Sequence, residues 1–245
     1  MTMPLPPLDL IALALFVLLW LGYGPAQRWF GASTINARLH RVRVLWMHSM
    51  MRRDNRIADS SLIGHVVHSA SFFASTSLIA IGALLGVLTG LDRLQTALEG
   101  LGLGADRHVL AARVLLPLLV LVHGLFKLTW ALRQLNYTVA LMGAIPVEVP
   151  PEGLRAELAE RLGAVLTSAL ATFNDGIRSY YFALAAVLWL AGPWALAAGG
   201  AALFALLVFR QLGSGIAAEF AAAVRLVEAA HAPSIADAGG DKRAP

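Results

Sequence analysis

Two histidines and five hydroxyl side chains lie together in the stretch GHVVHSASFFASTS, residues 64–77, inside one of the most apolar regions of the chain. On a helix, at about 100° per residue, most of them share one stripe roughly 120° wide. The stripe consists of Ser61, His65, His68, Ser69, Phe72, Ser75 and Thr76. Lipid cannot satisfy such groups, so we expect this face to look into a helix bundle, a subunit interface or a water-filled cavity.

Three kinds of chemistry fit this polar face. Small residues let helix backbones approach, and their hydroxyls bond the carbonyls of the preceding turn. Alternatively, the face lines a hydrated path in which ions or protons meet His65, His68, Ser69, Ser75 and Thr76. A metal or bis-histidine haem would need His65 and His68 to meet His123 at a similar depth. Since neither span offers a carboxylate partner, we predict no metal and no cofactor.

A second group of polar residues is expected at the cytoplasmic edge of the membrane, as a network around the mouth of a cavity. Its candidate members are Arg56, Asp59, Arg133, Asn136, Tyr137, Asn174, Asp175 and Arg178. Arg56 with Asp59, and Asp175 with Arg178, are spaced for pairing within one helix, although the carboxylates could equally pair across helices. Solvated charges with tyrosines anchored at the lipid headgroups are the alternative.

The composition indicates a protein surrounded by lipid. Apolar residues make up 58% of the 245 residues and charged residues 14%, whereas soluble domains average about 45–50% and about 25%. The chain has no cysteine, which excludes disulfides and thiolate chemistry. The basic residues flank apolar segments and form no free basic domain, so a nucleic-acid partner is not expected. We find no catalytic motif and predict no enzyme activity.

The elements that must position these residues are predicted to be helices, which gives an all-α, polytopic membrane bundle. An apolar stretch of about 20 residues spans a bilayer, and Ala191-Gly192-Pro193 signals a turn. Five spans follow, at about residues 8–23, 62–91, 109–132, 172–191 and 194–214. The competing prediction keeps residues 180–209 as one tilted helix and gives four spans.

Arginines are most frequent between the first and second spans and between the third and fourth. By the positive-inside rule these loops are cytoplasmic, with the N-terminus outside and the C-terminus inside. We therefore expect a multi-pass protein of the cytoplasmic (inner) membrane, with anionic lipids of the inner leaflet as partners.

Two cytoplasmic segments, about 34–57 and 152–171, have the spacing of amphipathic helices. The first either lies on the anionic leaflet or packs on the protein's own spans. IPVEVPP, residues 145–151, must be extended or turned because of its prolines. Residues 1–231 are predicted to form a single membrane domain, followed by a disordered tail at 232–245. Gly82, Gly86 and Gly90 mark a close-packing face typical of a bundle or an oligomer.

Three longer phrases carry a family resemblance: SFFASTSLIAIGALLGVL, RQLNYTVALMGAIP and FNDGIRSYYFALAAVLWLAGPW. They resemble the membrane-protein family called domain of unknown function 599, from about Trp46 to about Arg225. The resemblance implies a multi-spanning protein of bacteria and plants without an assigned activity. It places a functional site first at Asn136-Tyr137 and at 174–181; His65 and His68 are not part of the family pattern.

These observations favour a small channel- or transporter-like protein that assembles as a homo-oligomer. The polar face of residues 61–76 would line its path, and the arginine-rich network would form its inner mouth. A non-transporting scaffold or sensor with a basic cytoplasmic face is the alternative, and a haem- or metal-dependent redox protein is a third.

Overall fold

The computed structural model describes residues 5–29, 35–212 and 215–231, with side chains for 5–26, 38–210 and 218–231. Every regular element in these ranges is helical, which confirms the all-α prediction. The elements are α1 (Pro7–Trp29), α2 (Ile35–Met50), α3 (Ile57–Thr89), α4 (Leu91–Glu99), α5 (Arg107–Ala144), α6 (Glu152–Val187), the 3-10 helix η2 (Leu188–Ala191), α7 (Pro193–Leu212) and α8 (Gly215–His231).

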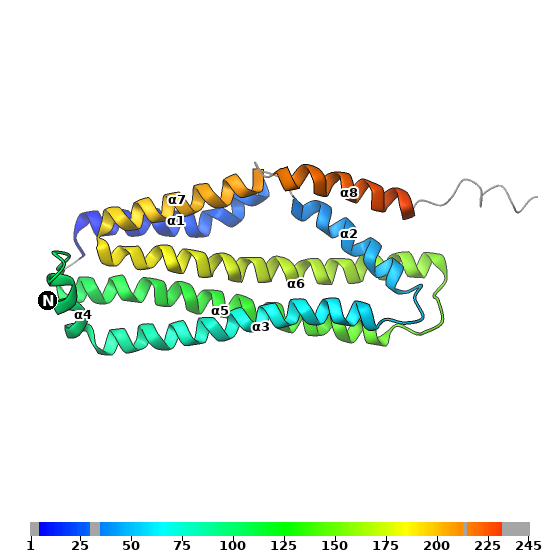
Figure 1. Cartoon of the computed structure of the whole chain (residues 1–245), viewed down its shortest axis with the longest axis horizontal. Helices are drawn as coiled ribbons and strands as arrows, with labels where there is room; N and C mark the ends of the chain where they lie inside the picture. The colour runs from blue at the N-terminus through cyan, green and yellow to red at the C-terminus, as the bar shows by residue number, and fades with distance from the viewer. Residues whose placement is uncertain (1–4, 30–34, 213–214, 232–245) are drawn as a thin grey trace, which may run out of the picture.

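Three long helices form the body of the molecule: α3 packs on α5, and α5 packs on α6 (Figure 1). On its other side α6 is covered along one half by α1 and α7 and along the other half by α2, on which α8 packs (Figure 1). The start of α1, α4 and the η2 turn lie at one end of the bundle (Figure 1). The helices α2 and α8 and the 145–151 connection lie toward the other end.

The long helices exceed the thickness of a bilayer. They contain 33, 38 and 36 residues, which at about 1.5 Å per residue gives roughly 50–57 Å, against about 30 Å of hydrocarbon. A helix of this length that crosses a bilayer must therefore extend beyond its hydrocarbon layer. The described residues form three buried cores. One lies beside α1 and α7 around Phe16, Phe182 and Trp189, another beside α2 around Met47, Met50 and Leu166, and a small one beside α4 around Leu98 and Leu110.

Four of the described helices are long and apolar enough to cross a membrane by length and composition: α1, α3, α5 and α7. The fourth predicted span, 172–191, is not among them. Its first half carries Asn174, Asp175 and Arg178, which lower its hydropathy. Instead, the segments predicted as a cytoplasmic helix and a span form one continuous helix, α6, because no proline interrupts the sequence from 152 to 187.

Several other boundaries differ from the predictions. The helix predicted at 34–57 ends at Met50, and α3 begins at Ile57. The short helix α4 occupies the predicted second loop, and α8 continues the chain beyond the last predicted span.

Gly192, with φ of 119°, forms the predicted turn between η2 and α7, a conformation open mainly to glycine. Residues 145–151 form no regular element, as their prolines predict. The predicted disordered tail, 232–245, lies outside the described residues.

The helix α2 packs on the protein's own helices, but its most buried face is not the apolar stripe that the spacing predicts. Of that stripe Met50 is buried, and Leu39, Val42 and Trp46 are half-buried. Val44, Met47 and Met50 are buried against α3, α5 and α6. This segment was expected either to lie on the anionic leaflet or to pack on the protein's own helices, and the structure shows the second.

A close approach of α2 and α6 at Gly163 yields a testable consequence. A Cβ added there would lie 2.6 Å from Val44 Cγ2 and 3.1 Å from the Val44 Cα and N. Gly163→Ala is expected to destabilise the fold by about 1–3 kcal/mol of overpacking, offset in part by about 1 kcal/mol of helix propensity. Thermal unfolding of the purified protein measures it. The control is Gly153→Ala on the same helix, where a Cβ meets nothing within 4 Å; equal shifts for both would contradict the close approach.

Candidate functional site

The polar face of α3 points away from the bundle. His65, His68 and Ser75 are exposed, and Ser69 and Thr76 are half-buried. The two latter hydroxyls donate to the carbonyls of the preceding turn, Ser69 to His65 at 3.1 Å and Thr76 to Phe72 at 2.9 Å. Their hydrogen-bonding needs are thus met within the helix. A path along this face is not enclosed by one chain and would require a second one.

The three histidines of the cofactor hypothesis do not meet. His123 packs edge-on against Trp20, with ring centroids 5.2 Å apart. Since Arg56 on α3 contacts Ile145 on α5 and the two helices run antiparallel (Figure 1), His123 lies about 15–20 Å along the bundle from His65 and His68, at about 1.5 Å per residue. Within the described ranges, no group of three or more His, Asp or Glu side chains could hold a metal ion.

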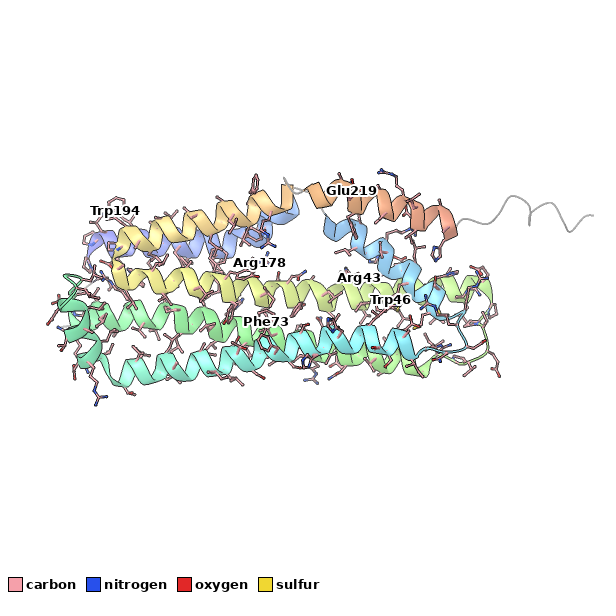
Figure 2. The ribbon with its side chains drawn as sticks, in the orientation of Figure 1. Arg43, Trp46, Phe73, Arg178, Trp194 and Glu219 are labelled. Carbon is pink, nitrogen blue, oxygen red and sulfur yellow. The ribbon has the colours of Figure 1, made fainter. Side chains whose placement is uncertain are left out.

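The eight residues of the predicted mouth network separate into three groups along the bundle. Arg56 lies near the end of α5, whereas Arg178 lies near the middle of the molecule, beside the α5–α6 contact at Gly124 (Figure 2). From Gly124 to Ile145 the axial distance is about 30 Å, at about 1.5 Å per residue. The structure therefore does not bring these groups to one site.

The first group centres on Asp59, which is completely buried. Its Oδ1 accepts from Trp46 Nε1 at 2.6 Å and from Arg53 Nη1 at 2.5 Å. Arg56, which the spacing offered as its partner, instead donates to the carbonyls of Ile145 and Pro146 at 2.9 and 2.8 Å. Asp59 thus ties α2 to α3, and Arg56 ties α3 to the end of α5.

The second group lies on the surface of α5. Arg133 Nε donates to the Tyr137 hydroxyl at 2.7 Å, and its guanidinium lies 6.0 Å from the ring centroid. Asn136 beside them is exposed. These contacts stay within one helix turn and enclose no cavity.

In the third group, Asp175 and Arg178 pair as their spacing predicts. The Arg178 guanidinium also lies 4.7 Å from the centroid of the buried Tyr23 ring, and the Tyr23 hydroxyl donates to the Leu207 carbonyl at 3.4 Å. Asn174 is exposed. This group joins α6 to α1 and α7, close to the boundary between the two halves of the bundle.

A buried ion pair at the opposite end was not predicted. Arg113 donates to Asp9 Oδ1 from Nε at 3.2 Å and from Nη2 at 3.0 Å. Trp189 Nε1 donates to the same oxygen at 2.7 Å. The pair joins α1, α5 and η2. A signal was present, because Arg113 interrupts the apolar run VLAARVLLPLL, and a charge inside a span usually has a partner.

A cluster of histidines and charges joins α2, α6 and α8. Arg155 Nε donates to His48 Nε2 at 3.2 Å, which fits a neutral imidazole that accepts at this nitrogen. Ser49 on α2 lies 2.7 Å from His231 Nε2 on α8. Burial, with the charges of Arg155, Arg52 and His231, lowers the pKa of His48, while the Glu152 carboxylate, 3.0 Å away, acts in the opposite sense.

The direction of this pKa shift predicts a pH dependence. Because the pKa of His48 is lower in the folded chain than its usual value of about 6.5, the unfolded chain binds more protons in this range. The contribution of His48 to stability is therefore complete above about pH 6.5 and is lost as the pH falls through the lower, folded value. We expect the amides of α2 and α8 to be less protected at pH 5 than at pH 7.5, when hydrogen exchange is compared with the intrinsic exchange rate at each pH.

His48→Gln should flatten this pH dependence. His108→Gln is the control, because His108 is exposed at the start of α5, at the other end of the bundle. An unchanged dependence in His48→Gln would assign the effect to other groups.

Comparison with known proteins agrees with the resemblance noted above. Residues 11–216 match the family model described as "Protein of unknown function, DUF599". Neither a curated protein nor a solved structure matches the chain.

Proposed function

The chain belongs to the family of proteins of unknown function DUF599, matched over most of its length, and we propose from its geometry that it is a membrane-anchored scaffold or sensor. One half of the bundle would anchor it, and the other half would project from the membrane as a packed helical body. The observation that supports this proposal is the buried core beside α2, a further packed region along helices that are longer than a bilayer can cover.

The anchoring half would consist of α1, α7 and the adjoining parts of α3, α5 and α6. We propose five spans, with the end of α6 as the fifth. It packs against α5 on one side and α7 on the other, so Arg178 and Ser179 would be shielded from lipid. Polar side chains within a membrane usually face the bundle interior in this way.

The projecting half would lie in the cytoplasm, beneath the inner membrane. It carries Arg41, Arg52, Arg53, Arg161 and Arg225 on its exposed surface, whereas Arg93 and Arg107 are exposed at the other end. An excess of arginine marks the cytoplasmic side. The N-terminus would then be outside, α8 inside, and the basic surface would face the anionic lipids of the inner leaflet.

The arrangement of α3 and α5 supports a protein that does not transport by itself. α5 is the central helix, and its inward residues Val114, Leu121, Leu128 and Leu135 are buried along most of its length. The hydroxyls of Ser69 and Thr76 are used within α3. Neither feature supports a polar path through one chain.

Single cysteines in the cysteine-free chain test this orientation. Glu148→Cys, in the exposed connection between α5 and α6, should react with a membrane-impermeant thiol reagent only in inverted vesicles. Arg93→Cys, exposed on α4, should react only in right-side-out vesicles. Reaction from the same side would overturn the proposed threading, and ion flux above that of empty liposomes would overturn a non-transporting function.

A channel-like homo-oligomer is the second candidate, and the uncovered face of α3 is the observation in its favour. His65, His68 and Ser75 continue along the helix into Gly82 and Gly86, where an added Cβ would meet nothing within 4 Å. Small residues four apart let two membrane helices approach closely. A second copy on this face would enclose the polar residues between two chains.

Oxidative crosslinking distinguishes the two candidates. In the channel-like assembly Ser75→Cys should form a disulfide-linked dimer, and Leu119→Cys, exposed on α5, should not. Substituting His65 and His68 by Ala should then reduce flux in liposomes. If neither a crosslinked dimer nor ion flux is observed, the scaffold or sensor is the candidate that remains.

A further inference from the structure

A cavity of about 300 Å³ lies between the end of α2, the start of α3 and the end of α5. It is at the end of the bundle farthest from α4 and η2 (Figure 1). Its inner wall is formed by the buried side chains of Met50, Ile63 and Met142. Val139 and Val147 line it from the rim, 47% and 78% exposed. The cavity is therefore apolar inside and open to the surroundings at one side.

A cation lies at this apolar cavity. The Arg56 guanidinium is held by the carbonyls of Ile145 and Pro146, at 2.9 and 2.8 Å. These bonds fix its position, yet they use only part of its five N–H donors and leave its charge uncompensated. Within the described part of the chain, no carboxylate forms an ion pair with Arg56, and Asp59 is engaged with Arg53. Ser60, one turn further along α3, adds a hydroxyl to the same cavity.

The volume limits what fits. Ligand sites usually measure about 300–1,000 Å³, so this one lies at the lower end. At about 30 Å³ for each water-sized group, the volume of a water molecule in the liquid, it has room for roughly ten non-hydrogen atoms. A complete two-chain lipid is far larger, whereas a short-chain carboxylate has this size.

We propose that this cavity binds a small anionic amphiphile, an apolar chain with a carboxylate head. The carboxylate would accept N–H groups of Arg56 as a charge-assisted pair and the hydroxyl of Ser60, and the chain would lie against Met50, Ile63 and Met142. Burial of the ligand's hydrocarbon chain displaces water from the apolar wall of the cavity, which favours binding. The proposal concerns binding alone and holds whether the protein is a scaffold, a sensor or a channel-like assembly.

Binding of octanoate, with ten non-hydrogen atoms, tests the proposal. Equilibrium dialysis of radiolabelled octanoate against the full chain in nanodiscs, with empty nanodiscs subtracted, should show one saturable site per chain. Octanol, of the same length but without charge, should compete at least tenfold less well. Partition into lipid alone would show no saturation and no preference for the carboxylate, and either finding would overturn the proposal.

Two variants separate the cavity from the rest of the molecule. Gly143 lines the cavity, and a Cβ there meets nothing within 4 Å, so Gly143→Leu should fill the space and weaken octanoate binding at least tenfold without disturbing the fold. Gly153→Leu is the matched control, equally open but outside the cavity. Arg56→Gln should weaken octanoate at least tenfold and change octanol little. Equal binding by Gly143→Leu and Gly153→Leu would overturn the site even if Arg56→Gln fails to fold.

Discussion

Arg113→Ala is expected to destabilise the folded chain by about 3–5 kcal/mol, the usual cost of leaving a buried charge without its partner. Arg113 and Asp9 are only 7% and 3% exposed. Without the guanidinium, the Asp9 carboxylate would keep the Trp189 indole as a donor, which cannot compensate its charge. Thermal unfolding of the protein in detergent or nanodiscs measures the effect, at roughly 2–4 °C per kcal/mol for a chain of this size.

Two further variants show whether the effect belongs to the buried charge. Arg107→Ala removes an arginine from the same helix, whose pair with Asp92 at 3.1 Å is well exposed. Such surface pairs contribute about 0–1 kcal/mol, so its unfolding temperature should change little. Asp9→Asn combined with Arg113→Gln removes both charges and keeps an acceptor for Trp189, and it should recover most of the loss. A double variant as unstable as Arg113→Ala would show that the charge is not the cause.

Features of the fold that depend on neighbouring residues in the sequence could be predicted. Gly192 next to Pro193 marks a turn in any context, and the prolines of 145–151 exclude a helix. The polar stripe of α3 is also correct as a stripe, because helical periodicity fixes which residues share a face. Periodicity does not determine which neighbour covers that face, and none of the described helices does.

Contacts between distant segments could not be predicted in the same way. Asp59 has arginines three and six residues before it, and only the turn between α2 and α3 decides that Arg53 approaches it while Arg56 reaches the end of α5. His48 meets Arg155 because α2 lies across α6. The continuity of α6, in contrast, was visible in the sequence as the absence of a proline.

The two halves of the bundle are fastened by the same arrangement of side chains. In each half a carboxylate in the first turn of a helix accepts from a tryptophan indole and an arginine, at Asp9 in one half and at Asp59 in the other. A negative charge is favourable in a first helical turn. Each carboxylate also joins that helix to others of the bundle. Stability of both halves should therefore depend on a few polar contacts as well as on apolar packing.

Asp59→Ala is expected to destabilise the half of the bundle that contains α2 by about 3 kcal/mol or more. Its two hydrogen bonds involve a charged carboxylate, and such bonds contribute about 1.5–3 kcal/mol each. The bond from Arg53 belongs at the lower end, because the Arg53 side chain is 47% exposed and regains water when the bond is lost. The bond from the partly buried Trp46 indole accounts for the rest. Hydrogen exchange at the start of α3 and thermal unfolding measure the loss.

Asp54→Ala separates this contact from a general effect of removing negative charge. Asp54 is exposed in the same turn between α2 and α3, and its removal should leave the unfolding temperature nearly unchanged. If the Trp46 bond matters, Trp46→Phe and Asp59→Ala should be less than additive when combined, because each removes the same interaction. Strict additivity, or equal losses for Asp54→Ala and Asp59→Ala, would show that the buried carboxylate does not join α2 to α3. The packing of Met47 and Met50 would then be sufficient to hold α2 on the bundle.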